Sequence, residues 1–103
     1  MNLRRMRYMM NRLPMARHRA ETANPDLREF ARDQYKAIRD ELAALQQEAK
    51  LLIDALDDPL EQTVMRMRYI DGLSVRRIAE QLHYSEGHIF RVLRTAEAKI
   101  NPS

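Results

Sequence analysis

The stretch SVRRIAEQLHYSEGHIFRVL, residues 74–93, decides the fold. Ser74 and Ser85 are of the type that caps helix N-termini, so they predict one helix ending near Leu82 and a second that runs to about residue 100. Ala79 is small enough for the two helices to cross closely there. Four apolar residues lie where they would fill the angle between the helices: Ile78, Leu82, Ile89 and Val92. The pattern predicts a helix-turn-helix.

The second of these helices has two different faces when its residues are placed on a wheel of 100° per residue. One face is apolar and consists of Ile89, Val92, Leu93, Ala96 and Ile100. The opposite face carries Gly87, Arg91, Arg94, Thr95 and Ala98, with His88 and Phe90 at its edges. It is polar, basic and low in bulk, as a helix in the major groove of DNA should be. We expect Phe90 to be half-covered by a neighbouring helix, with contact to a thymine methyl group as the alternative.

Two proline signals mark helix starts upstream. In Asp58-Pro59-Leu60-Glu61, Asp58 can cap a helix, Pro59 fills its first position, and Glu61 is placed to complete a capping box. Gly72 favours the left-handed turn that ends this helix. In Asn24-Pro25-Asp26, the same logic starts a long helix at Pro25.

The long helix carries a heptad seam, with apolar residues in steps of four and three at Ile38, Leu42, Leu45, Ala49, Leu52 and Leu56. Such a narrow apolar stripe is typical of a helix that packs against a partner helix. It therefore predicts a coiled coil and an oligomer, a dimer in the simplest case. Folding of the seam back over the C-terminal helices is the alternative.

Residues 1–20 hold six arginines and no acid. Leu3, Met6, Met10 and Leu13 share a helical face before Pro14, so a short amphipathic docking helix is one interpretation. A disordered basic arm and a targeting peptide are the alternatives.

Charge is distributed unevenly along the rest of the chain. Residues 21–63 contain eleven acids and five bases, and residues 64–103 contain seven bases and four acids. An acidic middle between two basic ends predicts two surfaces that meet a polyanion and a central segment that avoids it.

Composition excludes several classes of protein. The 103 residues include no cysteine, so a disulfide or a thiolate zinc site is impossible. His83 and His88 lack a third ligand, and the chain has no phosphate loop or nucleophile elbow, so we expect no metal, no cofactor and no enzyme activity. No apolar stretch reaches the length of a membrane span or a secretory signal, so we expect no membrane partner and a cytoplasmic location.

Residues 56–100 resemble region 4 of bacterial sigma factors, a match over about 45 of 103 residues at Val64, Arg68, Tyr69, Gly72, Leu73, Ser74, Ile78, Ala79, Leu82, Ser85, Ile89 and Ala96. The whole layout is similar to short phage and prophage regulators of late-gene transcription. The resemblance implies a three-helix domain that reads promoter DNA. The chain departs from the pattern at His83, where glycine is usual, at Arg77, where an acid is frequent, and at Gly87, where a longer side chain often meets bases.

The sequence thus predicts an all-α protein: a basic arm or short helix over residues 1–23, a long coiled-coil-forming helix over 24–57, and a sigma-region-4-like helix-turn-helix domain over 58–103. Double-stranded DNA is the expected partner, and RNA polymerase a further one. The predicted DNA-binding residues are Arg68, Arg76, Arg77, Ser85, Gly87, His88, Arg91, Arg94 and Thr95. Of these, Arg68, Arg76 and Arg77 are expected on phosphates, and His88, Arg91 and Arg94 on base edges, with Arg91 the best candidate for guanine.

Two alternatives to a DNA-binding regulator remain open. One is a module that contacts RNA polymerase or another sigma factor and binds DNA weakly. The other is a small terminase subunit that packages phage DNA.

Overall fold

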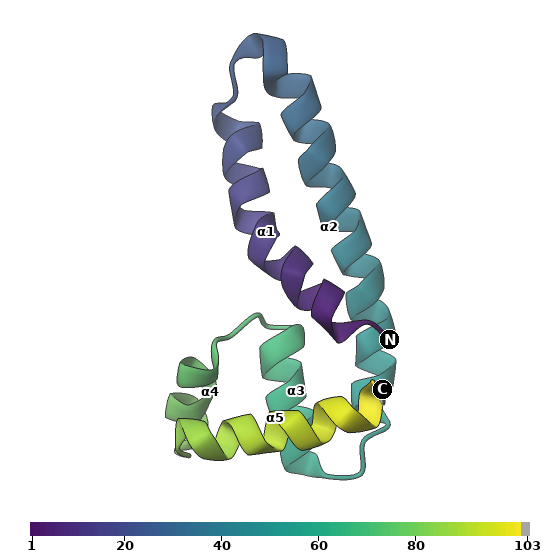
Figure 1. Ribbon diagram of the computed structural model, residues 1–103, viewed down its shortest axis with the longest axis vertical. Helices are drawn as coiled ribbons and strands as arrows, with labels where there is room; N and C mark the ends of the chain where they lie inside the picture. The colour runs from purple at the N-terminus through teal and green to yellow at the C-terminus, as the bar shows by residue number, and fades with distance from the viewer. Residues whose placement is uncertain (102–103) are drawn as a thin grey trace. The chain divides into compact units, whose positions relative to one another are not determined.

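The computed structural model describes residues 1–101, which fold into α-helices with no strand among them (Figure 1). The helices are α1 (Leu3–Thr22), α2 (Pro25–Asp54), α3 (Pro59–Tyr69), α4 (Val75–Leu82) and α5 (Glu86–Ile100). The predicted all-α fold is confirmed. The last two residues of the predicted segment 58–103 lie outside the described residues.

The chain divides into two compact units. Residues 2–45 form the hairpin unit, which contains α1 and most of α2. The described residues from 46 onwards form the C-terminal unit, which contains the end of α2 together with α3, α4 and α5. The boundaries predicted from the sequence, after residues 23 and 57, lie at the connections between α1 and α2 and between α2 and α3.

In the hairpin unit, residues 3–22 are helical, and Pro14 lies inside α1 rather than after its end. A proline at this position removes one helical hydrogen bond, and an interior proline costs a helix about 3 kcal/mol. Leu3 and Met6 of the predicted apolar face are buried, whereas Met10 and Leu13 are half-buried. Two further residues of α1 are buried, Met9 and Ala16, and neither belongs to the predicted apolar face. Tertiary packing therefore keeps α1 helical in spite of its proline.

Two contacts between residues distant in sequence join α1 to α2 within the hairpin unit. Arg5 Nε donates to Glu41 Oε1 at 2.5 Å, and the Arg17 guanidinium lies 5.8 Å from the ring centroid of Tyr35. The hydrogen bond from Arg5 holds the pKa of Glu41 below its ordinary value.

The long helix begins at Pro25 as predicted but ends at Asp54, before the last position of the heptad seam. Leu56 is buried outside the helix, where its amide donates to the Ile53 carbonyl at 3.1 Å. Of the other seam residues, Ile38, Leu42 and Ala49 are buried, and Leu45 and Leu52 are half-buried. Pairing of the seam with a second chain stays a prediction.

In the C-terminal unit, α3, α4 and α5 pack against one another. Their shared core contains Val64, Met65, Tyr69, Ile78, Ala79, Ile89, Leu93 and Ala96. Each helix starts at the predicted cap: Asp58 accepts from the amide of Leu60, Ser74 from that of Arg77, and Ser85 from that of His88. The three predicted helix starts are confirmed.

Two residues adopt left-handed backbone in the turns of this unit. Gly72 has a φ of 74° after α3, as its sequence position predicts. His83 has φ 60° and ψ 41° at the end of α4. The left-handed conformation costs a residue with a Cβ atom roughly 1–2 kcal/mol, so His83 strains the turn that orients α5.

The predicted role of Glu61 as the acid of a capping box is wrong. The Glu61 side chain is buried, and its two carboxylate oxygens accept from Lys99 Nζ at 2.8 and 3.0 Å. A carboxylate on the inner side of α3 needs a charged partner, and Lys99 of α5 provides it in place of the local backbone amide. The same hydrogen bond raises the pKa of Lys99. The pair ties α5 to α3.

Candidate nucleic-acid interface

The helices α4 and α5 pack against each other at the residues that the sequence predicts for their crossing. Ala79 is 3% exposed, and Ile78 and Ile89 are fully buried. Leu82 and Val92 are half-buried at the edge of the same contact. The Tyr84 amide donates to the Ala79 carbonyl at 3.0 Å, which closes the turn between the helices. The packing fixes the direction of α5 against α4.

The opposite side of α5 is open. Gly87, Arg91, Arg94, Thr95 and Ala98 are all exposed. Within the described part of the chain, neither Arg91 nor Arg94 forms an ion pair. The two guanidinium groups, three residues apart on one face, are therefore available to an external acceptor.

Gly87 leaves room for Arg91. A Cβ atom added at Gly87 would lie 3.7 Å from Arg91 Nη1, an ordinary van der Waals distance. The guanidinium thus lies over the glycine, one turn back along α5, towards the capped N-terminus. A longer residue at position 87 would compete with Arg91 for this space.

His88 and Tyr84 form a stacked pair at the start of α5. Their ring centroids are 4.6 Å apart, with an interplanar angle of 25°. Tyr84 is 45% exposed, and it is not among the DNA-binding residues predicted from the sequence. The stack restricts the His88 ring near the N-terminus of α5. In the sequence, the stack is indicated by the spacing of four residues between Tyr84 and His88, on either side of the cap residue Ser85.

Two predicted contact residues have hydrogen bonds inside the chain. Thr95 Oγ1 donates to the Arg91 carbonyl at 3.1 Å, so its proton is already used within α5. Arg68 is half-buried, and its Nη1 donates to the Leu73 carbonyl at 3.1 Å. Arg68 therefore supports the turn between α3 and α4.

The arginines of the first turn of α4 differ from each other. Arg76 Nε lies 3.3 Å from Glu80 Oε1, an exposed pair of the kind that contributes little to stability. Arg77 is exposed and has no ion-pair partner among residues 1–101. Arg77 is thus the better placed of the two for a phosphate.

Within the described range, no group of three histidine, cysteine or acidic side chains is placed to hold a metal ion. None of the helices that the structure describes has the length and apolar character needed to span a membrane.

The sequence model of a family described as "Protein of unknown function (DUF1492)" matches residues 29–101. The chain belongs to this family. The family match includes most of α2 and all of α3, α4 and α5, and begins after α1. No curated protein and no solved structure matches the chain.

Proposed function

We propose that the chain is a sequence-specific duplex-DNA-binding transcription regulator in which α4 and α5 act as a helix-turn-helix. The observation that carries the proposal is the exposed face of α5, where two arginines without ion pairs flank a low-bulk surface. An α-helix with its side chains is about 10–12 Å in diameter, and the major groove is about 12 Å wide, so the groove can admit α5.

Arg91 is the proposed reader of a guanine, because a guanidinium can donate two hydrogen bonds to O6 and N7 of that base. Arg94 and His88 would contact neighbouring base edges from the same face. Arg77 and the capped N-terminus of α5 beside Ser85 would meet phosphates, which are attracted by the positive end of a helix dipole. The resemblance to sigma region 4 supports the same division, and the separate similarity of the whole layout to short phage and prophage regulators suggests late-gene transcription as the regulated process.

The test begins with selection of binding sites from random duplexes by the full chain. On the selected duplex, Arg91→Ala should lose about 1–3 kcal/mol of binding, and on a scrambled duplex much less, because a base contact provides discrimination. Lys50→Ala, which removes an exposed cation outside the proposed face, serves as the matched control. Fluorescence anisotropy at two salt concentrations measures both losses. Equal losses on the two duplexes would contradict the assignment of Arg91.

A module that binds RNA polymerase is the second candidate. It is favoured by the exposure of Phe90 and Tyr84, at 54% and 45%, beside the basic face. Exposed aromatic side chains are typical anchors of protein interfaces. Phe90→Ala should then abolish binding to purified RNA polymerase and leave duplex affinity unchanged. If wild-type protein binds no duplex at micromolar concentration and about 50 mM salt, this candidate replaces DNA reading.

A further inference from the structure

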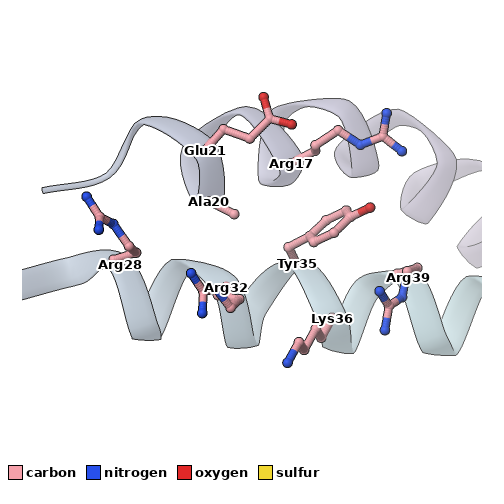
Figure 2. A pocket seen from close by; sticks show the side chains of 8 residues that line it. All are labelled: Arg17, Ala20, Glu21, Arg28, Arg32, Tyr35, Lys36 and Arg39. Carbon is pink, nitrogen blue, oxygen red and sulfur yellow. The ribbon is translucent and has the colours of Figure 1, made fainter. Parts of the chain in front are cut away.

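The hairpin unit contains a basic cleft of about 480 Å³ between α1 and α2 (Figure 2). It is lined by Tyr35, by one carboxylate, Glu21, and by five cations: Arg17, Arg28, Arg32, Lys36 and Arg39. We call this surface the hairpin cleft. None of its residues belongs to the proposed face of α5.

The cleft separates charges that are mixed along the sequence. Residues 21–63 contain five bases, of which four line the cleft: Arg28, Arg32, Lys36 and Arg39. Of the eleven acids in the same segment, Glu21 alone lies among the lining residues. A segment with a negative net charge thus presents a positive surface towards the cleft, although Arg28, Arg32 and Lys36 also line an adjacent hollow together with Glu29 and Asp33.

Three of the cations form a stripe on α2. Arg28, Arg32 and Lys36 follow one another at intervals of four residues, which places them about 6 Å apart along the helix. Like charges at this interval weaken a helix, so the stripe has a structural cost. In the described part of the chain none of the three forms an ion pair, although Glu29 and Asp33 are close in sequence. Their charges remain available to an external anion.

Tyr35 organises the two remaining arginines. Its ring extends from α2 towards α1, beside Arg17 (Figure 2). The guanidiniums of Arg17 and Arg39 lie 5.8 and 5.7 Å from the ring centroid. Cation–π contacts of this kind hold a guanidinium in place. Arg39 also pairs with Asp40, because its Nε donates to Asp40 Oδ1 at 3.2 Å, so we assign the contacts with an external anion to the stripe. Because the ring already contacts two side chains, the cleft suits phosphates better than unstacked bases.

We propose that the hairpin cleft is a second DNA contact that holds the phosphodiester backbone. The regular spacing of Arg28, Arg32 and Lys36 favours an evenly charged polymer over an irregular acidic segment of a protein. The stripe extends over about 12 Å, the axial length of three to four phosphates of one strand. The inference deepens the proposed function and rests on it for the identity of the nucleic acid as duplex DNA.

The experiment compares two double variants of the full chain that remove the same charge. Arg28→Gln/Arg32→Gln changes the stripe, and Arg4→Gln/Arg7→Gln changes exposed cations of α1 that do not line the cleft. The stripe variant should lower the slope of log affinity against log salt by about two on both selected and scrambled duplexes, because each lost phosphate contact releases about one counterion fewer. The α1 variant should leave the slope within about half a unit of wild type. Circular dichroism checks that both variants keep their helices, which removal of like charges should not weaken.

Three results would overturn the inference. The first is a salt slope in the stripe variant that equals the wild-type slope. The second is a fall of the slope in the α1 variant as large as that in the stripe variant, which would mean that net charge alone causes the effect. The third is a stripe variant that keeps the wild-type salt slope on DNA but loses affinity for polyglutamate. This result would mean that the cleft binds an acidic protein segment.

A third variant, Arg91→Ala/Arg94→Ala, separates this inference from the proposed function. If wild type binds selected and scrambled duplexes equally well, the proposed function fails. A smaller salt slope in the stripe variant would then still support the hairpin cleft as a phosphate contact. Lost discrimination in the α5 variant, with an unchanged slope in the stripe variant, would support the proposed function and overturn the cleft.

Discussion

The hairpin unit and the C-terminal unit are both helical, but different kinds of interaction define them. The helices of the C-terminal unit start at the local caps Asp58, Ser74 and Ser85. The hairpin unit is joined by pairs of residues far apart in sequence, such as Arg5 with Glu41. Local rules therefore account for where the helices of the C-terminal unit start, whereas the pairing of α1 with α2 depends on residues far apart in sequence.

The same difference applies to the two charged surfaces. The face of α5 can be drawn on a helical wheel because a single helix provides Arg91 and Arg94. The hairpin cleft combines Arg17 of α1 with the α2 stripe, so it exists only once the helices are paired. Counting charges along residues 21–63 treats all sides of α2 as one surface, and this is why the sequence predicts a segment that avoids polyanions.

The largest expected effect concerns the seam of α2, which runs through both units. If Leu45 pairs between chains, Leu45→Lys would bury an unpaired charge in each copy, at a cost of several kcal/mol, and dissociate the dimer. In a monomer the half-buried Leu45 tolerates lysine better, since the long side chain can extend to solvent. Leu51→Lys is the control, because Leu51 is 74% exposed and outside the seam. Light scattering at about 100 μM decides: a monomeric wild type, or a folded Leu45→Lys dimer, would show that the seam does not pair chains.

The next effect tests whether the C-terminal unit depends on the crossing of α4 and α5. Ala79→Leu places three extra carbon atoms at a position 3% exposed, and overpacking of this kind costs about 1–3 kcal/mol. The thermal midpoint should fall, and duplex affinity should fall more than helicity. Ala44→Leu makes the same change at an exposed position of α2 and should shift stability by less than about 0.5 kcal/mol. Equal midpoints for the two variants would place Ala79 outside the crossing.

Part of this fold follows from the sequence alone. The helix starts follow from hydrogen bonds between capping side chains and the backbone within a few residues, which the sequence states directly. The left-handed turn at His83 is implied by the resemblance, since glycine is usual at that position. Glu61 was assigned to a local cap, but Lys99, 38 residues away, binds its carboxylate. Pro14 was taken as a helix boundary, although packing across the hairpin unit keeps α1 continuous. For the α5 face, the wheel predicts the exposed arginines but not the hydrogen bond from Thr95 to the Arg91 carbonyl. The hydrogen bond from Arg68 of α3 to the Leu73 carbonyl likewise depends on side-chain geometry, which the sequence pattern does not contain.

A smaller effect is expected at the turn before α5. His83→Gly should stabilise the protein by about 1 kcal/mol, because glycine adopts a φ of 60° without the Cβ clash. His83→Ala keeps the Cβ and should show no such gain, so the pair isolates backbone strain from loss of the imidazole. Chemical denaturation with equal m-values measures the difference. A destabilised glycine variant would mean that the imidazole contributes more than the strain costs.

The smallest effect concerns the ion pair of the hairpin unit. The hydrogen bond from Arg5 lowers the pKa of Glu41 in the folded chain, so the pair stabilises fully above the unfolded pKa of this carboxyl. Its contribution is lost as the pH falls through the lower, folded value. Arg5→Gln should therefore reduce the thermal midpoint slightly at pH 7, and leave it equal to wild type at an acid pH below the folded pKa of Glu41, where this carboxyl is protonated in both proteins. Arg4→Gln, at an exposed neighbour that lines no cleft, should match wild type at both pH values. Because the Arg5 and Glu41 side chains are 51% and 39% exposed, solvent and salt screen the pair, and the difference should shrink further in high salt.

A difference between wild type and Arg5→Gln that is the same at both pH values would mean that Arg5 acts by packing alone. NMR titration of the Glu41 carboxyl would then give the same pKa in the two proteins.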